Sequence, residues 1–177
     1  MPSSDPLPRP ANGVVLRRLA VTDVAAFQAY RHDAGLGRYQ GWSAVSDDEA
    51  SSFLSEMSVA NLFEPGAWCQ IGIADPRSDL LLGDIGVFLA GDGAHAEIGV
   101  SLGRESQGHG LATDAVREAI KLVFEQTKCG AVHGITDARN LASIRLLERV
   151  GMRRTETRDT MFRSETCVEY VYVIARP

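Results

Sequence analysis

Three consecutive apolar runs, each followed by a turn, lie in the middle of the chain and predict β-strands, and in the third run apolar and polar residues alternate. The stretches cover residues 67–74, 79–89 and 94–102, and turn-forming residues follow them, namely Asp75-Pro76, Gly91-Asp92-Gly93 and Gly103. Such short connections favour an antiparallel meander. In the third stretch His95, Glu97, Gly99 and Ser101 share one face, which is therefore polar and small, while the opposite face is apolar.

Helical spacing of apolar residues marks the segments on either side of this meander. Residues 111–124 carry an apolar stripe opposed by charged residues, with Gly130 just beyond the predicted end. Ser46 and Glu49 have capping-box spacing and predict a helix that runs to about residue 60. Two further helices are predicted, one with Thr22 as its N-cap and one over residues 140–150 with Gly151 at its C-terminal cap.

The order of these elements predicts the fold class. Further strands are expected at residues 14–19 and 131–136, and an antiparallel pair at residues 152–176. A strand, helices, a run of strands and then helix, strand, helix and strands describe a mixed α/β or α+β sandwich. The proline-rich start predicts a flexible tail over residues 1–13, and the absence of any later linker or repeat predicts a single domain over residues 14–177.

Composition narrows the class of protein. The chain has 177 residues, a net charge of −5 and no apolar run near the roughly 18 to 20 residues that cross a bilayer, so we expect no membrane span. The acidic balance disfavours nucleic acid as a partner, because phosphate binding needs clustered Lys and Arg. Cys69, Cys129 and Cys167 are far apart, which argues against disulfides and a zinc site and favours a reducing cytoplasm.

The most informative segment joins the third strand to the helix at residue 111. A glycine-containing loop opens directly into an amphipathic helix there, with Gln107, Gly110 and Ala112 in the pattern Q-x-x-G-x-A. Backbone N–H groups at a helix start and closely approaching glycines suit a pyrophosphate. The P-loop pattern and a G-x-G-x-x-G after a strand are both absent from the sequence. The alternative interpretation of this segment is a simple turn.

This loop resembles that of the GNAT superfamily of acetyltransferases, whose pyrophosphate motif Q/R-x-x-G-x-G/A matches residues 107–112. The segments 97–102, 112–115, 140–143 and 146–152 are similar to the RimJ/RimL-type branch, and the resemblance extends from residue 16 to residue 172. It implies a GNAT fold with a central, mostly antiparallel splayed sheet flanked by helices. It also implies acetyl-CoA as cosubstrate, without a metal, bound by Val100, Leu102, Gln107, Gly108, His109, Gly110, Ala112, Thr113, Asn140 and Ser143.

Two catalytic residues follow from the same resemblance. Glu97 is the candidate general base, because the family often places a carboxylate on this strand; the alternative is a solvated strand residue, and His95 is a weaker candidate. Leu147 stands where many family members have a tyrosine that protonates the leaving thiolate. Ser143 is therefore the candidate general acid, with an ordinary helix-surface serine as the alternative.

The acceptor is left open at this stage. The resemblance implies a primary amine, either a protein N-terminus or a small molecule, attacked directly in a ternary complex because no Cys-His-acid set supports a covalent route. A CoA-binding module without catalysis is the alternative function. Trp42 and Trp68 either line an acceptor groove or pack in the core. The last strands of such folds often pair between subunits, which predicts a homodimer.

Overall fold

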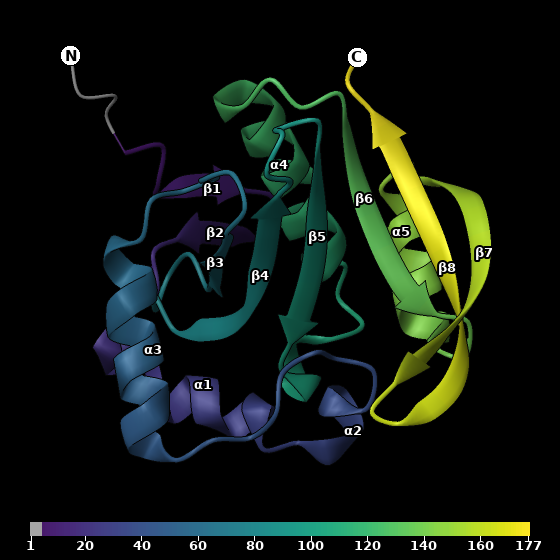
Figure 1. The fold of residues 1–177 in the computed structure, drawn as a ribbon. Coiled ribbons are helices and arrows are strands. Elements are labelled where there is room, and N and C mark those ends of the chain that lie inside the picture. The colour runs from purple at the N-terminus through teal and green to yellow at the C-terminus, as the bar shows by residue number, and fades with distance from the viewer. Residues whose placement is uncertain (1–4) are drawn as a thin grey trace.

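The computed structural model describes residues 5–177, which form one eight-stranded sheet in the order β1-β2-β3-β4-β5-β6-β8-β7 (Figure 1). All neighbouring strands are antiparallel except β5 and β6, which run parallel. The predicted meander, the predicted strand at residues 131–136 and the final antiparallel pair are all present. The strands are β1 (Arg9–Ala11), β2 (Val14–Arg17), β3 (Trp68–Ala74), β4 (Leu81–Leu89), β5 (His95–Leu102), β6 (Ala131–Asp137), β7 (Arg153–Phe162) and β8 (Glu165–Ala175).

Helices cover the two faces of the sheet unequally. The helices α4 and α5 lie behind the sheet in Figure 1, whereas α1, α2 and α3 lie at its lower front. The main core joins the sheet to α4 and α5, and a smaller core joins α1 and α3 to Leu19 and Leu81. Among residues 5–177, no helix lies over the front face beside β5, β6 and β8. The helices are α1 (Val24–Arg31), α2 (Ala34–Gly37), α3 (Asp47–Val59), α4 (Leu111–Gln126) and α5 (Leu141–Arg149).

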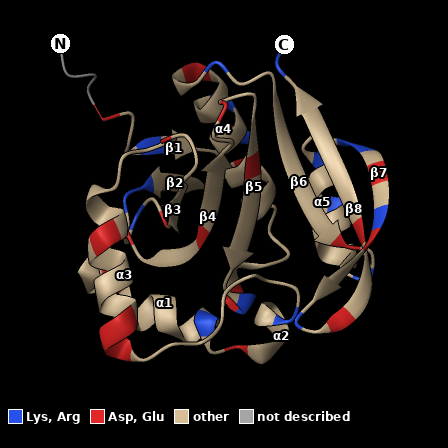
Figure 2. Cartoon of the chain, viewed as in Figure 1, with Lys and Arg blue, Asp and Glu red and all other residues tan. Residues whose placement is uncertain are grey.

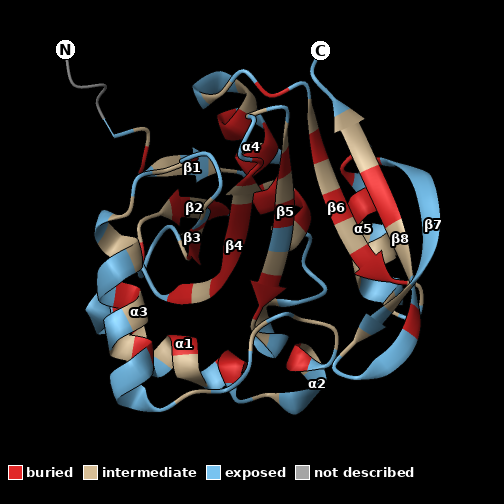
Figure 3. Cartoon of the chain, viewed as in Figure 1, coloured by how far each residue is buried: buried red, intermediate tan, exposed pale blue. Residues whose placement is uncertain are grey.

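Alternation along β5 sorts its side chains as the sequence predicts. Ala96 and Ile98 are buried against the helices, while Gly99 on the opposite face is exposed. Figure 3 shows the buried positions concentrated along the central strands and in α4. The apolar stripe of α4 packs here because its Ala, Val, Ile and Leu residues recur on one side. The polar face of β5 is consequently left for other contacts.

Part of the predicted tail is ordered. Residues 9–11 form β1, which pairs with β2, and Leu7 is buried in the main core. Arg9 forms ion pairs with Glu118 and Glu125 of α4. The prediction of a tail over residues 1–13 is therefore wrong for this stretch, because ion pairs with a distant helix leave no local pattern; residues 1–4 lie outside the described residues.

Helix ends agree with the sequence where side chains cap them. Ser46 and Glu49 form the predicted capping box of α3. Asp23, not Thr22, is the N-cap of α1, because a 3-10 turn at residues 21–23 comes first. Thr127 ends α4 ahead of Gly130 by bonding Val123 O through its N–H and its hydroxyl. The short α2 was not predicted. No helix among residues 5–177 is long and apolar enough to span a membrane.

Candidate active site

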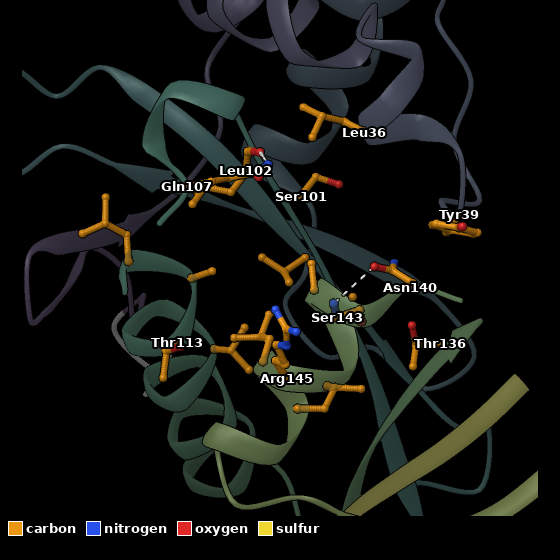
Figure 4. A pocket seen from close by; sticks show the side chains of 18 of the residues that line it. Leu36, Tyr39, Ser101, Leu102, Gln107, Thr113, Thr136, Asn140, Ser143 and Arg145 are labelled. Carbon is orange, nitrogen blue, oxygen red and sulfur yellow. Dashed lines mark hydrogen bonds between the residues drawn. The ribbon is translucent and has the colours of Figure 1, made fainter. Parts of the chain in front are cut away.

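The strands β5 and β6 separate and leave a wedge in the sheet. Their parallel pairing ends at Glu97 and His133, although β5 continues to Leu102 and β6 to Asp137. A cavity of about 600 Å³ fills this wedge and extends to the start of α4 and to α5 (Figure 4). Its size falls in the range typical of small-molecule and cofactor sites. Two strands that part in this way leave backbone groups free to pair with an extended ligand.

The phosphate-binding loop predicted from the sequence forms one end of the cavity. Gly108 and Gly110 adopt the left-handed conformation, with φ of 79° and 78°, and a Cβ on either would meet no atom within 4 Å. Gly110 is the N-cap of α4, and the first bond of that helix runs from Asp114 N to Gly110 O. The preceding N–H groups are thus free at the positive end of the helix dipole, where an anionic ligand is favoured.

Nine of the residues predicted to bind acetyl-CoA are brought together here. The cavity is lined by Val100, Leu102, Gln107, Gly108, Gly110, Ala112, Thr113, Asn140 and Ser143. The side chain of Gln107 donates from Nε2 to Leu102 O at 2.9 Å, so it fixes the loop to the end of β5. His109 is exposed and does not line the cavity, so the structure does not bring it together with the other nine residues.

Other lining residues were missed from the sequence. Arg145 of α5 projects into the cavity between α4 and α5, and its cationic side chain suits a phosphate (Figure 4). Its position in the same helix as Ser143 could have indicated this. Tyr39 and Gln40 line the opposite side, and Gln40 Nε2 donates to Val100 O at 3.3 Å. They follow α2 in an irregular segment without a periodic pattern, so only the tertiary fold places them.

Asn140 and Ser143 meet at the start of α5. Asn140 caps the helix by accepting the backbone N–H of Ser143 at its Oδ1, at 3.2 Å (the dashed line in Figure 4). No hydrogen bond among residues 5–177 engages Asn140 Nδ2 or the Ser143 hydroxyl. Leu147 also lines the cavity, and it packs so closely that a Cβ on Gly134 would lie 2.6 Å from it. An apolar side chain thus occupies the position where the resemblance implies a tyrosine.

Glu97 lies at the apex of the wedge, on the sheet face away from α4. It does not line the cavity; Gly99, two residues further along the same face of β5, does. Burial raises the pKa of the Glu97 carboxyl. The positive charge of Arg158 lowers this pKa, and the negative charge of Glu169 raises it further. The neighbouring His95 and His133 rings stack with their centroids 4.5 Å apart, and burial lowers the pKa of His133. A carboxyl with a raised pKa is suited to accept a proton near neutral pH.

The two tryptophans have different surroundings. Trp42 donates from Nε1 to Ser101 Oγ at 2.9 Å and lies with its ring 4.5 Å from the guanidinium of Arg31. That guanidinium bonds Asp84 inside the sheet at 2.8 Å. Trp42 therefore anchors the segment after α2 to β5. Trp68 is half exposed at the start of β3 and does not belong to either core.

Comparisons with known proteins agree with this geometry. Residues 14–153 match the family model described as an acetyltransferase (GNAT) domain. An uncharacterized N-acetyltransferase, p20 of Bacillus licheniformis, is 23% identical over 142 residues, which cover 80% of this chain and 79% of the relative.

Solved structures share the fold. An acetyltransferase of the GNAT family from Bacillus anthracis superposes with a TM-score of 0.83 at 20% identity, covering 94% of this chain and 97% of that one. A spermidine N-acetyltransferase from Vibrio cholerae, in complex with CoA and spermine, superposes with a TM-score of 0.78 at 17% identity, covering 93% of this chain and 96% of that one. Together with the splayed strands and the glycine loop, the match over most of the sequence places this chain in the GNAT family of acetyltransferases.

Proposed function

We propose that this protein transfers the acetyl group of acetyl-CoA to a primary amine in a ternary complex. The observation that carries the proposal is the continuity of the wedge between β5 and β6 with the glycine loop at the start of α4. Pyrophosphate binds the free N–H groups from Gly108 onward, and Arg145 adds a positive charge beside it. Pantetheine lies in the wedge against the backbone of Val100 and Leu102.

The residues at the apex of the wedge support the transfer step. The amine nitrogen attacks the thioester carbonyl from the Glu97 side, a C–N bond forms, and the C–S bond breaks. Glu97 accepts the proton that the amine loses, directly or through water, and the Ser143 hydroxyl protonates the departing thiolate. Backbone N–H groups freed from the separated strands stabilise the oxyanion. Tyr39 and Gln40 enclose the cavity on the acceptor side.

Two acceptor classes fit this chemistry. A protein N-terminus accords with a place in the RimJ/RimL-type branch, while a small amine would use the same donor site. An α-amino group titrates near 8 and a lysine near 10.4, so an N-terminal acceptor needs only a modest base. The cytoplasm, where acetyl-CoA meets either acceptor, suits a protein whose Cys69, Cys129 and Cys167 are buried free thiols.

A CoA-binding module without catalysis is the second candidate. The buried Leu147, which supplies no proton where a tyrosine is expected, favours it. Tight acetyl-CoA binding without CoA release over a broad panel of amines would identify this function.

Thermal unfolding with and without acetyl-CoA tests the donor site. A ligand that binds only the native state adds about 2.7 kcal/mol to stability at 100 times its Kd. We expect a clear upward shift in Tm, followed by release of free CoA thiol when an accepted amine is added. No shift at millimolar acetyl-CoA would refute the donor site and with it the proposed function.

A further inference from the structure

Two paired glycines, Gly99 and Gly86, form a strip without side chains that leads from the apex of the wedge across the sheet. Gly99 of β5 and Gly86 of β4 are directly paired, and Gly99 lines the cavity. A Cβ on Gly99 would meet nothing within 4 Å, whereas a Cβ on Gly86 would lie 3.3 Å from the Trp68 ring and 3.0 Å from the Gln70 amide. The surface is therefore open over Gly99 beside the cavity, while the Trp68 indole and the Gln70 amide cover Gly86.

Aromatic side chains border this strip. Phe88 of β4 is the register partner of both Trp68 on β3 and Glu97 on β5, so the three side chains form one row across the sheet. The ring centroids of Trp68 and Phe88 lie 5.5 Å apart at 41°. The Trp68 side of the row is open, because the residue is 50% exposed. A row of two aromatic rings and one carboxylate is suited to a ligand with an apolar body and one positive charge.

The charges on this face favour a single cation. Glu97 is the acidic residue on β3 to β6 that has no ion pair within residues 5–177. The other two acids on these strands, Asp84 and Asp137, are bonded by Arg31 and Arg139 at 2.8 and 2.7 Å.

Beyond Glu97 the neighbouring carboxylates are paired with arginines. Arg158 forms an ion pair with Glu169 at 3.1 Å. Asp137 is bonded by Arg139, which lowers the pKa of its carboxyl, and the nearby charge of Arg38 lowers this pKa further. On β3 to β6, as far as residues 5–177 show, a polyamine would therefore find one unpaired carboxylate for its several charges, because Arg31 and Arg139 already neutralise the other two.

We propose that the acceptor is a primary amine carried by an aromatic group, with its ring on Trp68 and its nitrogen above Gly99 beside Glu97. This assignment rests on the proposed function. The Trp68 ring reaches over Gly86 of β4, and the neighbouring strands β4 and β5 are ~4.8 Å apart. A nitrogen above Gly99 is therefore about one strand spacing from the edge of that ring, a distance that an arylethylamine spans. The nitrogen bonds the acetyl carbon, its proton leaves towards Glu97, and CoA departs as the thiol.

The full chain can be tested with matched amines at saturating acetyl-CoA. We expect kcat/KM for 2-phenylethylamine to exceed that for n-propylamine and for spermidine by about tenfold or more, the order expected for one aromatic contact with its buried area. Trp68→Ala should raise the KM for 2-phenylethylamine by about tenfold, Trp68→Phe should restore most of the affinity, and the acetyl-CoA Kd should change less than about twofold. Leu80→Ala, at an exposed apolar residue at the other end of the β3–β4 hairpin, is the control and should match the wild type.

Binding is also measured directly by fluorescence. In the presence of CoA, 2-phenylethylamine should quench the emission of the wild-type protein, and this quench should be lost in Trp68→Phe. A preference for spermidine that is insensitive to Trp68→Ala, or the absence of both the turnover preference and the quench, overturns the aromatic acceptor. Either result leaves the donor site intact if acetyl-CoA still raises the Tm, so the two proposals fail separately.

Discussion

At the scale of single residues, Glu97 determines the expected dependence of turnover on pH. Its carboxyl must be ionised to accept a proton, and burial raises its pKa, so kcat should fall as the pH drops through that raised value. Glu97→Gln should lower kcat by about 10²-fold, the lower end of general-base effects, and abolish the acidic limb of the profile. Glu56→Gln, at an exposed position on α3, is the control. An unchanged profile in Glu97→Gln would show that the carboxyl is not the base.

The proposed general-acid role of Ser143 can be tested separately from that of Glu97. Its hydroxyl faces the cavity, and its backbone N–H, which bonds Asn140, is preserved in Ser143→Ala. We expect kcat to fall by about tenfold, less than for the base because CoA thiolate leaves readily without help, while the acetyl-CoA Kd stays constant. Ser52→Ala on the exposed face of α3 provides the comparison. Full turnover in Ser143→Ala would remove the general-acid role.

At the scale of elements, Asn140 caps the start of α5, and we propose that it also contacts acetyl-CoA. Asn140→Ala removes the cap and should cost about 1 kcal/mol of stability, measured by urea denaturation. Asn140→Asp keeps an oxygen for Ser143 N but loses the Nδ2 donor. We expect it to retain stability while raising the KM for acetyl-CoA. If the KM for acetyl-CoA is unchanged in both variants, the Asn140 amide does not contact the ligand.

At the scale of the whole molecule, a buried cluster joins α1 to the sheet. Asp84 is 1% exposed and accepts hydrogen bonds from Arg31, Tyr30 and Gln70. Asp84→Leu should reduce the free energy of unfolding by about 3–5 kcal/mol, because it leaves the Arg31 guanidinium buried and uncompensated. Asp33→Asn, which breaks an exposed pair with Arg104, should behave like the wild type in the same urea titration. Equal stability of both variants would contradict the buried pair as a link between layers.

The predicted homodimer also concerns the whole molecule. The strand β7 is an edge of the sheet, and Figure 2 shows both signs of charge along it. Edge strands that carry charge resist pairing through their backbone, so the predicted homodimer would need to form through other surfaces of the last two strands. Sedimentation at micromolar concentration tests it: a mass near 19.1 kDa alone would exclude the dimer.

The sequence by itself determined most of the helices and strands and the glycine loop before α4. Apolar runs between turns defined the meander, alternation defined the polar face of β5, and capping residues marked α3 and α5. Gln107, Gly110 and Ala112 marked the loop where we propose that pyrophosphate binds. These patterns depend on neighbours within a few residues. Only the tertiary structure decided that β1 is ordered, that Tyr39 and Arg145 line the cavity, and that Trp68, Phe88 and Glu97 form one row. Those relations depend on register and packing between segments far apart in the chain, which no local pattern records.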